Sequence, residues 1–552
     1  MTLKHDPLHH PYSSRRSVVY SQKGMVATSQ PLAAQAGLEA IKQGGNAIDA
    51  AVAAAACLTV TEPTSNGIGG DAFALIWTNG RLHGLNASGP APGLITAEKV
   101  IASGCSEMPN LGWPPVTVPG APAAWAELSH KWGKLSLEEA FAPAIAYARD
   151  GFPVSPVTAE IWGKAVQKYK SAWEEGGTKT KKGRGIGGEE GFREWFNIFA
   201  PDGKAPRAGE LCKLPDHAST LSVIAKEGAE VFYRGKIAEK IDAYSRNSGG
   251  FLRGEDLTGY EPVWVEPLSS DYRGCRIWEL PPNGQGLVAL LALNIFKELY
   301  SEKFDEEKLL HRRIESLKLA FAKGFRYITD PAKMKISPER LLEESYAQSM
   351  SKLIGDNAAF SEDVPGSGGG TVYLATADGE GNMVSFIQSN YEGFGSGLVV
   401  PGTGIALQNR GREFSLYPAH ANYLEPGKKP YHTIIPGFLT ENSLPLGPFG
   451  VMGGYMQPQG HFQLVTRMFD ERLNPQAALD APRWRWVEGN TIEVEHSFPL
   501  PLAHKLTARG HNVIYTHEPS GFGRGQVILQ DPNSGIFCGA TEPRADGTIA
   551  AW

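Results

Sequence analysis

A glycine-rich run that ends at a threonine constrains this chain more than any other segment. Residues 366–370 read Gly-Ser-Gly-Gly-Gly, and Thr371 follows them at the start of the β-type stretch 372–377, Val-Tyr-Leu-Ala-Thr-Ala. Glycine allows backbone geometry that other residues resist. We therefore expect the run to reach Thr371 in an unusual backbone conformation and to lead directly into a strand.

The junction between Gly370 and Thr371 has a chemical interpretation. If this peptide bond is cut, Thr371 becomes a chain terminus that carries both a hydroxyl nucleophile and a free α-amine. That pairing is the N-terminal-threonine version of acyl-transfer catalysis. A surface linker of Gly and Ser would also explain the run. A phosphate-binding loop fits less well, because its glycines open a helix and are followed by a lysine that is missing here.

Length and composition describe a large globular protein. The 552 residues exceed one ordinary domain, and 41% hydrophobic with 20% charged residues is enough to bury a large core. The net charge of −6 gives no electrostatic reason to expect nucleic acid or an anionic membrane as a partner.

No motif supports a metal or an organic cofactor. The five cysteines are scattered, with no CxxC pair or Cys/His cluster. The first residues lack the apolar region of a secretory signal. The longest apolar stretch, residues 47–60, is too short to span a bilayer. These features predict a cytoplasmic protein.

Alternating helical and strand-like blocks run along the chain. Ser29, placed before Pro31, predicts a capped helix that ends at Gly44-Gly45, and Asn46 predicts the cap of a second helix to about Leu58. Further helices are expected at 121–150, 287–300 and 315–326. Residues 174–190 predict a solvated insertion rather than an anion-binding loop. A hairpin is expected from 372–377 and 383–388. This order suggests sheets between helical layers.

An ordered series of motifs extends over nearly the whole chain, and with it the chain resembles the γ-glutamyltransferase family of N-terminal nucleophile hydrolases. The motifs lie at residues 44–51, 62–63, 67–70, 118–120, 148–152, 281–286, 326–331, 371–382, 393–397, 453–454 and 542–544. The resemblance implies an α+β fold, a four-layer αββα sandwich. It also implies an inactive precursor that cuts itself between Gly370 and Thr371.

The products implied by the resemblance are a large segment, 1–370, and a small segment, 371–552. Both would share one core and stay associated. A homodimer of this processed pair is compatible with the sequence. The expected partner is a small-molecule amide.

The resemblance also assigns catalytic roles. Thr371 would be the nucleophile, with its α-amine moving the proton. Ser389 matches the position whose hydroxyl hydrogen-bonds the nucleophile. The backbone N–H groups of Gly453 and Gly454 would form the oxyanion hole. His461, near the start of an apparent helix, is expected to cap or pack rather than to act as an acid or base.

Carboxylate recognition departs from the family pattern. The arginine of the family's Phe-Arg-Glu-Thr-Ala-Pro motif falls on Ser88, and a hydroxyl cannot clamp a carboxylate with two parallel hydrogen bonds. The family's paired serines, which are further carboxylate ligands, align with His432 and Thr433.

The acidic residue that meets a substrate α-amine aligns with Glu413, while Arg410 and Tyr391 replace neighbouring polar residues. Two interpretations follow. Either Arg410 and His432 substitute for the lost arginine, or Arg410 pairs with a structural carboxylate and the pocket accepts another acyl group. The family includes such divergent members, similar to cephalosporin acylases and oxamate amidohydrolases.

The sequence therefore predicts a self-processing Thr-nucleophile amidohydrolase that cleaves a small carboxylate-bearing amide, γ-glutamyl or related, through an acyl-enzyme. An oxamate- or glutaryl-amide hydrolase without γ-glutamyl activity is the alternative. A second alternative, of another class, is an uncleaved, non-catalytic relative that binds a metabolite.

Overall fold

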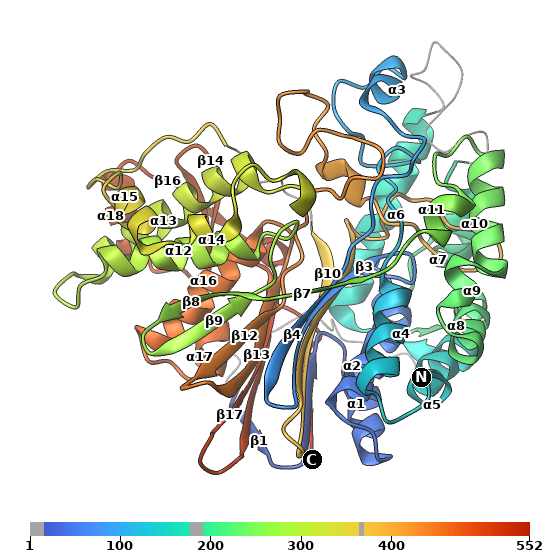
Figure 1. The fold of residues 1–552 in the computed structure, drawn as a ribbon, viewed down its shortest axis with the longest axis horizontal. Coiled ribbons are helices and arrows are strands. Elements are labelled where there is room, and N and C mark those ends of the chain that lie inside the picture. Colours follow the sequence, from blue (N-terminus) through green and yellow to red (C-terminus); the bar gives the residue numbers. More distant parts are fainter. Residues whose placement is uncertain (1–15, 177–190, 364–368) are drawn as a thin grey trace.

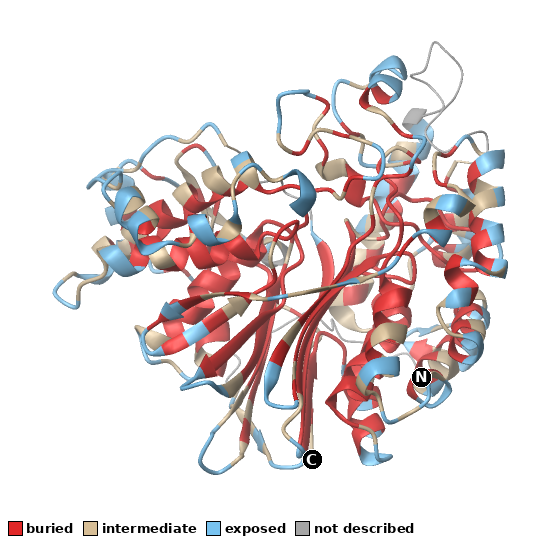
Figure 2. Ribbon diagram, viewed as in Figure 1, coloured by how far each residue is buried: buried red, intermediate tan, exposed pale blue. Residues whose placement is uncertain are grey.

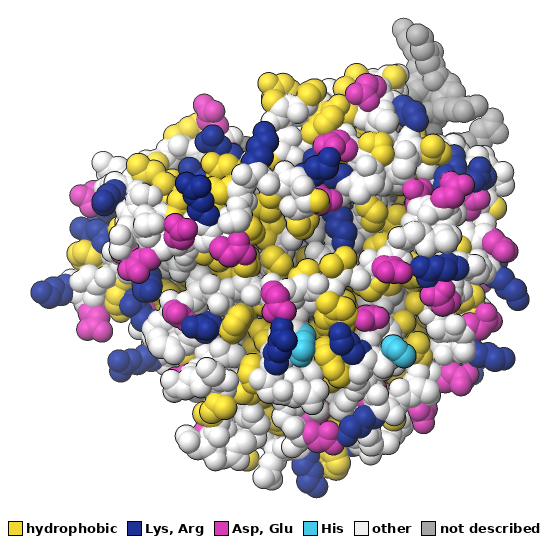
Figure 3. All heavy atoms as spheres, viewed as in Figure 1, with side chains coloured by type: hydrophobic (Ala, Val, Ile, Leu, Met, Phe, Trp, Pro, Cys, Tyr) yellow, Lys and Arg dark blue, Asp and Glu magenta, His cyan; other side chains and the backbone are white. Residues whose placement is uncertain are grey.

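The computed structural model describes residues 16–176, 191–363 and 369–552 (Figure 1). Two seven-stranded sheets pack face to face in the middle of the molecule, and helices cover the outer face of each. Strands, inward helix faces and the central loops are buried, while outer helix faces and peripheral loops are mostly exposed (Figure 2). On the face drawn in Figure 3, positive and negative side chains are interspersed rather than gathered in one patch.

The first sheet contains the strand that begins at the junction. All its neighbouring strands are antiparallel. Its order is β19 (Thr548–Ala551), β2 (Gly24–Thr28), β10 (Gly370–Asp378), β11 (Met383–Tyr391), β3 (Asp71–Thr78), β4 (Arg81–Ala87) and β7 (Val263–Val265). Every residue of β10 and β11 is buried, so this hairpin forms the centre of the sheet.

The second sheet is also antiparallel throughout. Its order is β1 (Val19–Ser21), β18 (Phe537–Thr541), β17 (Arg524–Gln530), β13 (Leu444–Met452), β12 (Gly437–Glu441), β9 (Cys275–Glu279) and β8 (Leu268–Tyr272). A core that includes Phe73, Tyr373, Phe438 and Ile528 fills the space between the two sheets.

Two helical layers complete the sandwich. The layer on the first sheet contains α1 (Pro31–Lys42), α2 (Ala47–Thr61), α4 (Ala121–Trp132) and α5 (Leu137–Asp150). The layer on the second sheet contains α12 (Gly286–Leu299), α13 (Glu306–Tyr327), α16 (Met456–Phe469) and α17 (Pro475–Asp480). Every residue of the alanine-rich α2 is buried, because small side chains let it lie between β10 and the other helices.

Both sheets mix strands from before and after Thr371. In the first sheet, β10 lies between β2 and β11, and β11 pairs in turn with β3. In the second, β9 from the first part of the chain pairs with β12. A cut after Gly370 would therefore leave two pieces held together by backbone hydrogen bonds and a common core.

Several predicted elements differ in their ends. Ser29 does not cap α1, because its hydroxyl donates to Glu62 Oε2 at 2.5 Å. Gln30 is the N-cap residue, and its side chain makes no capping hydrogen bond. Asn46 caps α2 as predicted, in a capping box with Asp49. The helix predicted at 315–326 is the second half of α13, which Asp305 caps.

The 372–377/383–388 hairpin is confirmed as β10 and β11. Most of the predicted insertion at 174–190, and residues 366–368 of the glycine run, lie outside the described residues. Among the described residues, no helix combines the length and apolar character needed to cross a bilayer.

Candidate active site

Thr371, Ser389 and Asp71 lie side by side on three neighbouring strands. Thr371 is opposite Ser389 in the β10–β11 ladder, and Ser389 is opposite Asp71 in the β11–β3 ladder. Directly opposite residues of antiparallel strands point to the same face of the sheet. All three are buried. The ladder thus places a hydroxyl, a second hydroxyl and a carboxyl in one row.

The Ser389 hydroxyl is the centre of this row. It accepts hydrogen bonds from Thr371 Oγ1 at 3.0 Å, from the Tyr391 N–H at 2.8 Å and from Arg410 Nη2 at 3.3 Å. It donates to the Gly370 carbonyl oxygen at 2.7 Å. Ser389 therefore connects the hydroxyl of Thr371 to the carbonyl of the bond that precedes it.

The junction glycines pass close to other backbone. A Cβ added at Gly369 would lie 3.0 Å from the carbonyl carbon of Gly453 and 3.1 Å from the nitrogen of Gly454. A Cβ at Gly370 would lie 2.2 Å from the nitrogen of Gly393. Only glycine lets the junction approach these groups without displacement.

Gly453 and Gly454 form the turn between β13 and α16. Their φ angles are +137° and +58°, which favour glycine. Neither N–H donates a hydrogen bond to any residue that the structure describes. Gln285 fixes the turn, because its Nε2 donates to the Gly454 carbonyl at 2.9 Å and to the Thr433 carbonyl at 2.6 Å. Sequence reasoning noted residues 281–286 as a motif but gave Gln285 no role.

Arg410 is fully buried beside Ser389. Besides its bond to Ser389, it donates from Nη1 to Thr433 Oγ1 at 2.6 Å, and its guanidinium lies 4.4 Å from the centre of the Tyr391 ring. Its Nε has no hydrogen-bond partner among the residues that the structure describes. Burial lowers the pKa of Arg410, and the nearby Asp71 and Glu413 oppose that shift. None of the ion pairs among the described residues includes it, so no structural carboxylate neutralises it directly.

Glu413 lies at the end of the same 3₁₀ turn, Arg410–Glu413. Its carboxylate accepts hydrogen bonds from the hydroxyls of Tyr455 and Tyr391. Burial raises the pKa of Glu413. Tyr391 adopts φ +77°, an uncommon conformation for an aromatic residue that is typical of constrained functional segments.

His432 binds Asp71 rather than Arg410. Its Nδ1 accepts from the Ile434 N–H at 3.3 Å, so Nε2 carries the proton and donates to Asp71 Oδ2 at 3.0 Å. Burial lowers the pKa of His432 well below its usual value, and Arg410 and Lys429 add to this effect. Both ring nitrogens of His432 are thus bonded within the protein, which weighs against the interpretation in which His432 substitutes for the lost arginine.

Asp71 itself was not predicted. It also accepts hydrogen bonds from the N–H groups of Gly89 and Gly120, at 3.2 and 3.1 Å, and from Gln408 Nε2 at 2.8 Å. Burial raises the pKa of Asp71 to about 7. Its position at the end of the Gly67–Gly70 motif was the available signal.

Ser88 is also occupied within the protein. Its hydroxyl donates to Asn86 Oδ1 at 2.7 Å and lies 3.3 Å from Asn283 Oδ1. The side chain is fully buried, and its hydrogen bonds lead to these two amides, not to Thr371 or Arg410. The residue aligned with the family's arginine therefore belongs to an internal amide cluster.

His461 packs inside the protein. It lies within α16 and does not cap it, and its Nδ1 is 2.6 Å from Glu279 Oε1. The packing interpretation fits this position.

One group of side chains among the described residues has the spacing of metal ligands: His311, Glu315 and His511. Most of their nitrogen and oxygen atoms already have protein partners. His311 Nδ1 lies 2.9 Å from His511 Nε2, and Glu315 is paired with Lys318 at 2.9 Å.

Comparisons with known proteins place the chain in a family. A family model described as gamma-glutamyltranspeptidase matches residues 33–552. The chain is 35% identical over 541 residues to a glutathione hydrolase-like YwrD proenzyme of Bacillus subtilis (strain 168), covering 96% of this chain and 98% of that one. It is 34% identical over 546 residues to an oxamate amidohydrolase proenzyme of Klebsiella pneumoniae subsp. pneumoniae, covering 96% and 99%.

A solved cephalosporin acylase from Bacillus halodurans matches the fold with a TM-score of 0.94 at 55% identity, covering 100% of this chain and 99% of that one. These matches confirm the resemblance to the divergent branch and the α+β sandwich. Because both the family model and these relatives extend over nearly the whole length, the chain belongs to the gamma-glutamyltranspeptidase family of N-terminal nucleophile hydrolases.

Proposed function

We propose that this protein is a self-processing amidohydrolase in which Thr371 is the nucleophile and the acyl group of the substrate carries a carboxylate. The observation that carries the proposal is the hydrogen-bonded row from Thr371 through Ser389 to the Gly370 carbonyl. The row joins the attacking hydroxyl to the carbonyl that it must attack.

In the precursor, Thr371 Oγ attacks the Gly370 carbonyl carbon. The C–N bond breaks, the hydroxyl proton ends on the departing α-amine, and an ester links Gly370 to the Thr371 side chain. Water then opens the ester, which leaves a carboxylate on Gly370 and a free Thr371 terminus. Ser389 supports the attack because its hydroxyl accepts from the nucleophile and donates to the carbonyl oxygen.

In the mature enzyme, the same hydroxyl attacks a substrate amide. The α-amine of Thr371 serves as the base, since the pKa of a terminal amine is about 7.7–8.0 in model peptides. The N–H groups of Gly453 and Gly454 stabilise the oxyanion, and the resulting acyl-enzyme is hydrolysed by water. Residues 1–370 and 371–552 stay together as the two segments of this enzyme.

Arg410 is the residue best suited to hold the substrate carboxylate. It is a buried cation beside Ser389, and no carboxylate in the described part of the chain forms an ion pair with it. A guanidinium can form two parallel hydrogen bonds to a carboxylate. Thr433 orients it, Tyr391 stacks on it, and Glu413 can accept a substrate α-amine. His432 and Ser88 do not contact the substrate carboxylate; they are positioning residues that bond Asp71 and Asn86.

A second candidate is an oxamate- or glutaryl-amide hydrolase without γ-glutamyl activity. Full burial of Ser88 and His432 favours this second candidate, because it leaves fewer side chains to bind a substrate carboxylate than the family pattern implies. An uncleaved metabolite-binding relative is less consistent with an intact Thr371–Ser389–Gly370 row. Cytoplasmic location and a homodimer stay predictions from the sequence.

Intact mass spectrometry of the purified protein beside a Thr371→Ala variant tests the nucleophile. We expect two fragments that meet at Gly370/Thr371, and one uncut chain in the variant. A single uncut wild-type chain would contradict the proposal.

Turnover of glutathione, a γ-glutamyl anilide, oxamate and a glutaryl amide, with a neutral acyl anilide as reference, tests the substrate class. Arg410→Met should reduce turnover of the carboxylate-bearing amides more than turnover of the neutral one. An equal loss for all of them would mean that Arg410 supports only Ser389.

A further inference from the structure

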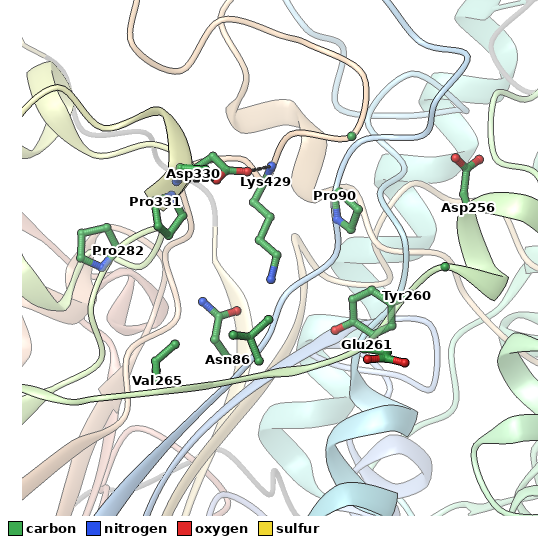
Figure 4. Close-up of a pocket in the computed structure, with 14 residues that line it drawn as sticks. Asn86, Pro90, Asp256, Tyr260, Glu261, Val265, Pro282, Asp330, Pro331 and Lys429 are labelled. Atoms are coloured by element: carbon green, nitrogen blue, oxygen red, sulfur yellow. Dashed lines mark hydrogen bonds between the residues drawn. The ribbon is translucent and has the colours of Figure 1, made fainter.

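The motif at residues 281–286 leads from the wall of a cavity into the candidate active site. Pro282 lines this cavity of about 380 Å³ together with Asn86 and Lys429 (Figure 4). Three residues further on, Gln285 is fully buried and is the N-cap residue of α12. The catalytic and substrate-binding roles assigned above do not use Gln285, although the sequence analysis singled out its motif.

The backbone of this motif is paired with the loop that carries His432. The Gln285 N–H donates to the His432 carbonyl at 3.0 Å, and the His432 N–H donates to the Asn283 carbonyl at 2.9 Å. The Asn283 side chain adds a bond from Nδ2 to the Pro430 carbonyl at 2.7 Å, across 147 positions of the chain. The two segments are therefore held side by side.

The side chain of Gln285 extends this connection to the glycine turn between β13 and α16. Its Nε2 donates to the Thr433 carbonyl at 2.6 Å and to the Gly454 carbonyl at 2.9 Å. Its Oε1 accepts from the Tyr431 hydroxyl at 3.1 Å. Because a carbonyl oxygen can only accept, the two carbonyls identify the nitrogen end of this amide. The carboxamide therefore uses both of its donor hydrogens and its oxygen within the protein.

The two carbonyls belong to residues with different roles in the proposed mechanism. The Thr433 hydroxyl accepts from Arg410 Nη1 at 2.6 Å, and Arg410 is the residue that would hold the substrate carboxylate. The N–H of Gly454 would stabilise the oxyanion. A second buried amide, Gln457, supports the same connection one step further on, where its Oε1 accepts from the Ile435 N–H at 2.9 Å. One carboxamide thus joins the residue that orients the guanidinium to the residue that supplies an oxyanion donor.

The acyl group of a carboxylate-bearing amide must reach both places at once. Its reacting carbonyl lies in the oxyanion hole and its carboxylate lies on the Arg410 guanidinium. The separation of these two places therefore determines how many methylenes fit between the amide and the carboxylate. A misplacement of about 1 Å can lower a rate by about 10²-fold. An acyl chain that is one methylene too long or too short is thus rejected only if the two places are held rigidly.

We propose that Gln285 is a positioning residue that sets the acyl length this enzyme accepts, because it holds the Thr433 segment and the glycine turn at a fixed separation. This role rests on the proposed function, in which Arg410 binds the substrate carboxylate and the glycine N–H groups stabilise the oxyanion. It defines a property of the substrate that those residues alone leave open, namely the distance between its amide and its carboxylate.

A series of dicarboxylic acid mono-para-nitroanilides, from oxalyl to adipyl, tests the proposal with the processed protein. Pentanoyl para-nitroanilide, which matches the glutaryl compound in length but has no carboxylate, is the reference. For the wild-type protein we expect kcat/KM to peak at one acyl length and to fall by about 10²-fold at the neighbouring lengths. Gln285→Met keeps the length of the side chain but removes its hydrogen bonds, and should reduce that difference to less than about tenfold.

Gln463→Met is the matched control. Gln463 is also a buried glutamine whose Nε2 donates to two backbone carbonyls, those of Gln459 at 3.2 Å and Trp484 at 2.8 Å, outside the candidate site. Both substitutions should lower the melting temperature, but only Gln285→Met should flatten the dependence of kcat/KM on acyl length. Gln285→Asn is the second variant. It keeps a carboxamide on a shorter side chain that reaches only one of the two carbonyls, so it should give an intermediate result.

All rates are divided by the processed fraction, which intact mass spectrometry measures. If Gln285→Met slows every substrate equally and keeps the wild-type dependence on acyl length, the proposal is overturned. The same flattening in Gln463→Met would also overturn it. Failure of the proposed function gives a different result: the wild-type protein would then turn over the pentanoyl compound as fast as the best carboxylate-bearing one, and no acyl length would be selected.

Discussion

Removal of the Ser389 hydroxyl tests whether the row from Thr371 to the Gly370 carbonyl performs the self-cleavage. Ser389→Ala takes away the acceptor of the Thr371 hydroxyl and the donor to the Gly370 carbonyl in one step. Losing one donor to a developing oxyanion typically lowers kcat by about 10²–10³-fold. We therefore expect precursor conversion to slow by about two to three orders of magnitude.

The same substitution also affects stability. It leaves the buried Tyr391 N–H and one Arg410 nitrogen without their acceptor. An orphaned buried donor costs about 1–3 kcal/mol. Conversion must therefore be measured on folded precursor, by a pulse of cell-free synthesis followed by mass spectrometry over time, with the melting temperature determined alongside.

Ser385→Ala is the matched control. Ser385 is a fully buried serine on the same strand, four residues earlier and on the same face, and its hydroxyl bonds Tyr373 instead. Ser389→Thr should restore most of the conversion, since it keeps the hydroxyl. Conversion of Ser389→Ala at a rate close to wild type, or equal slowing by Ser385→Ala, would refute the reasoning.

Three further predictions follow from the geometry. Gly369→Ala should slow self-cleavage about tenfold, because the added Cβ would lie 3.0 Å from the carbonyl carbon of Gly453 and displace the junction. Gly355→Ala is the control and should not slow self-cleavage, because its Cβ would meet no described atom within 4 Å. A time course on gels compares the two variants. Burial raises the pKa of Asp71 to about 7 in the folded protein, so the folded state binds the extra proton and stability should fall by up to about 1.4 kcal/mol per pH unit between pH 4 and 7. Urea unfolding at several pH values gives the slope of the unfolding free energy against pH, and the contribution of Asp71 to that slope should disappear in Asp71→Asn. An unchanged slope would contradict the burial of the Asp71 carboxyl as the cause of its raised pKa. Glu413→Gln should raise KM for γ-glutamyl anilide about tenfold but leave oxamate turnover unchanged, because only the former has an α-amine; equal effects in steady-state assays would exclude that role.

The sequence predicted the architecture because its signals were local and agreed with one another. The glycine run, the β-hairpin signal and the Asn46 cap each depend on a few adjacent residues, and the structure contains the hairpin and the cap. Ser29 misled because a distant carboxylate, Glu62, takes its hydroxyl. No local pattern reports such a contact.

The substrate pocket was harder to predict for the same reason. Alignment of His432 with a family position indicated a ligand, but its orientation depends on Asp71, which lies 361 residues away in the chain. Gln285 and Asp71 gain their importance only when separate segments meet. Residue type gave the chemistry of Arg410, and only the fold shows that no carboxylate of residues 16–176, 191–363 and 369–552 forms an ion pair with it.

The interleaved strands also indicate that this enzyme could be made without self-cleavage. The carbonyl of Trp552 accepts from the Lys23 N–H at 2.9 Å, and Arg16 Nη1 donates to the Glu542 carbonyl at 3.0 Å, so the end of the chain lies beside its first described residues. A circular permutant could therefore begin at Thr371, continue from Trp552 through a linker into the present N-terminal part, and end at Gly370. After removal of the initiator methionine, such a chain would carry its nucleophile as a free terminus without self-cleavage, which would separate the demands of maturation from those of turnover.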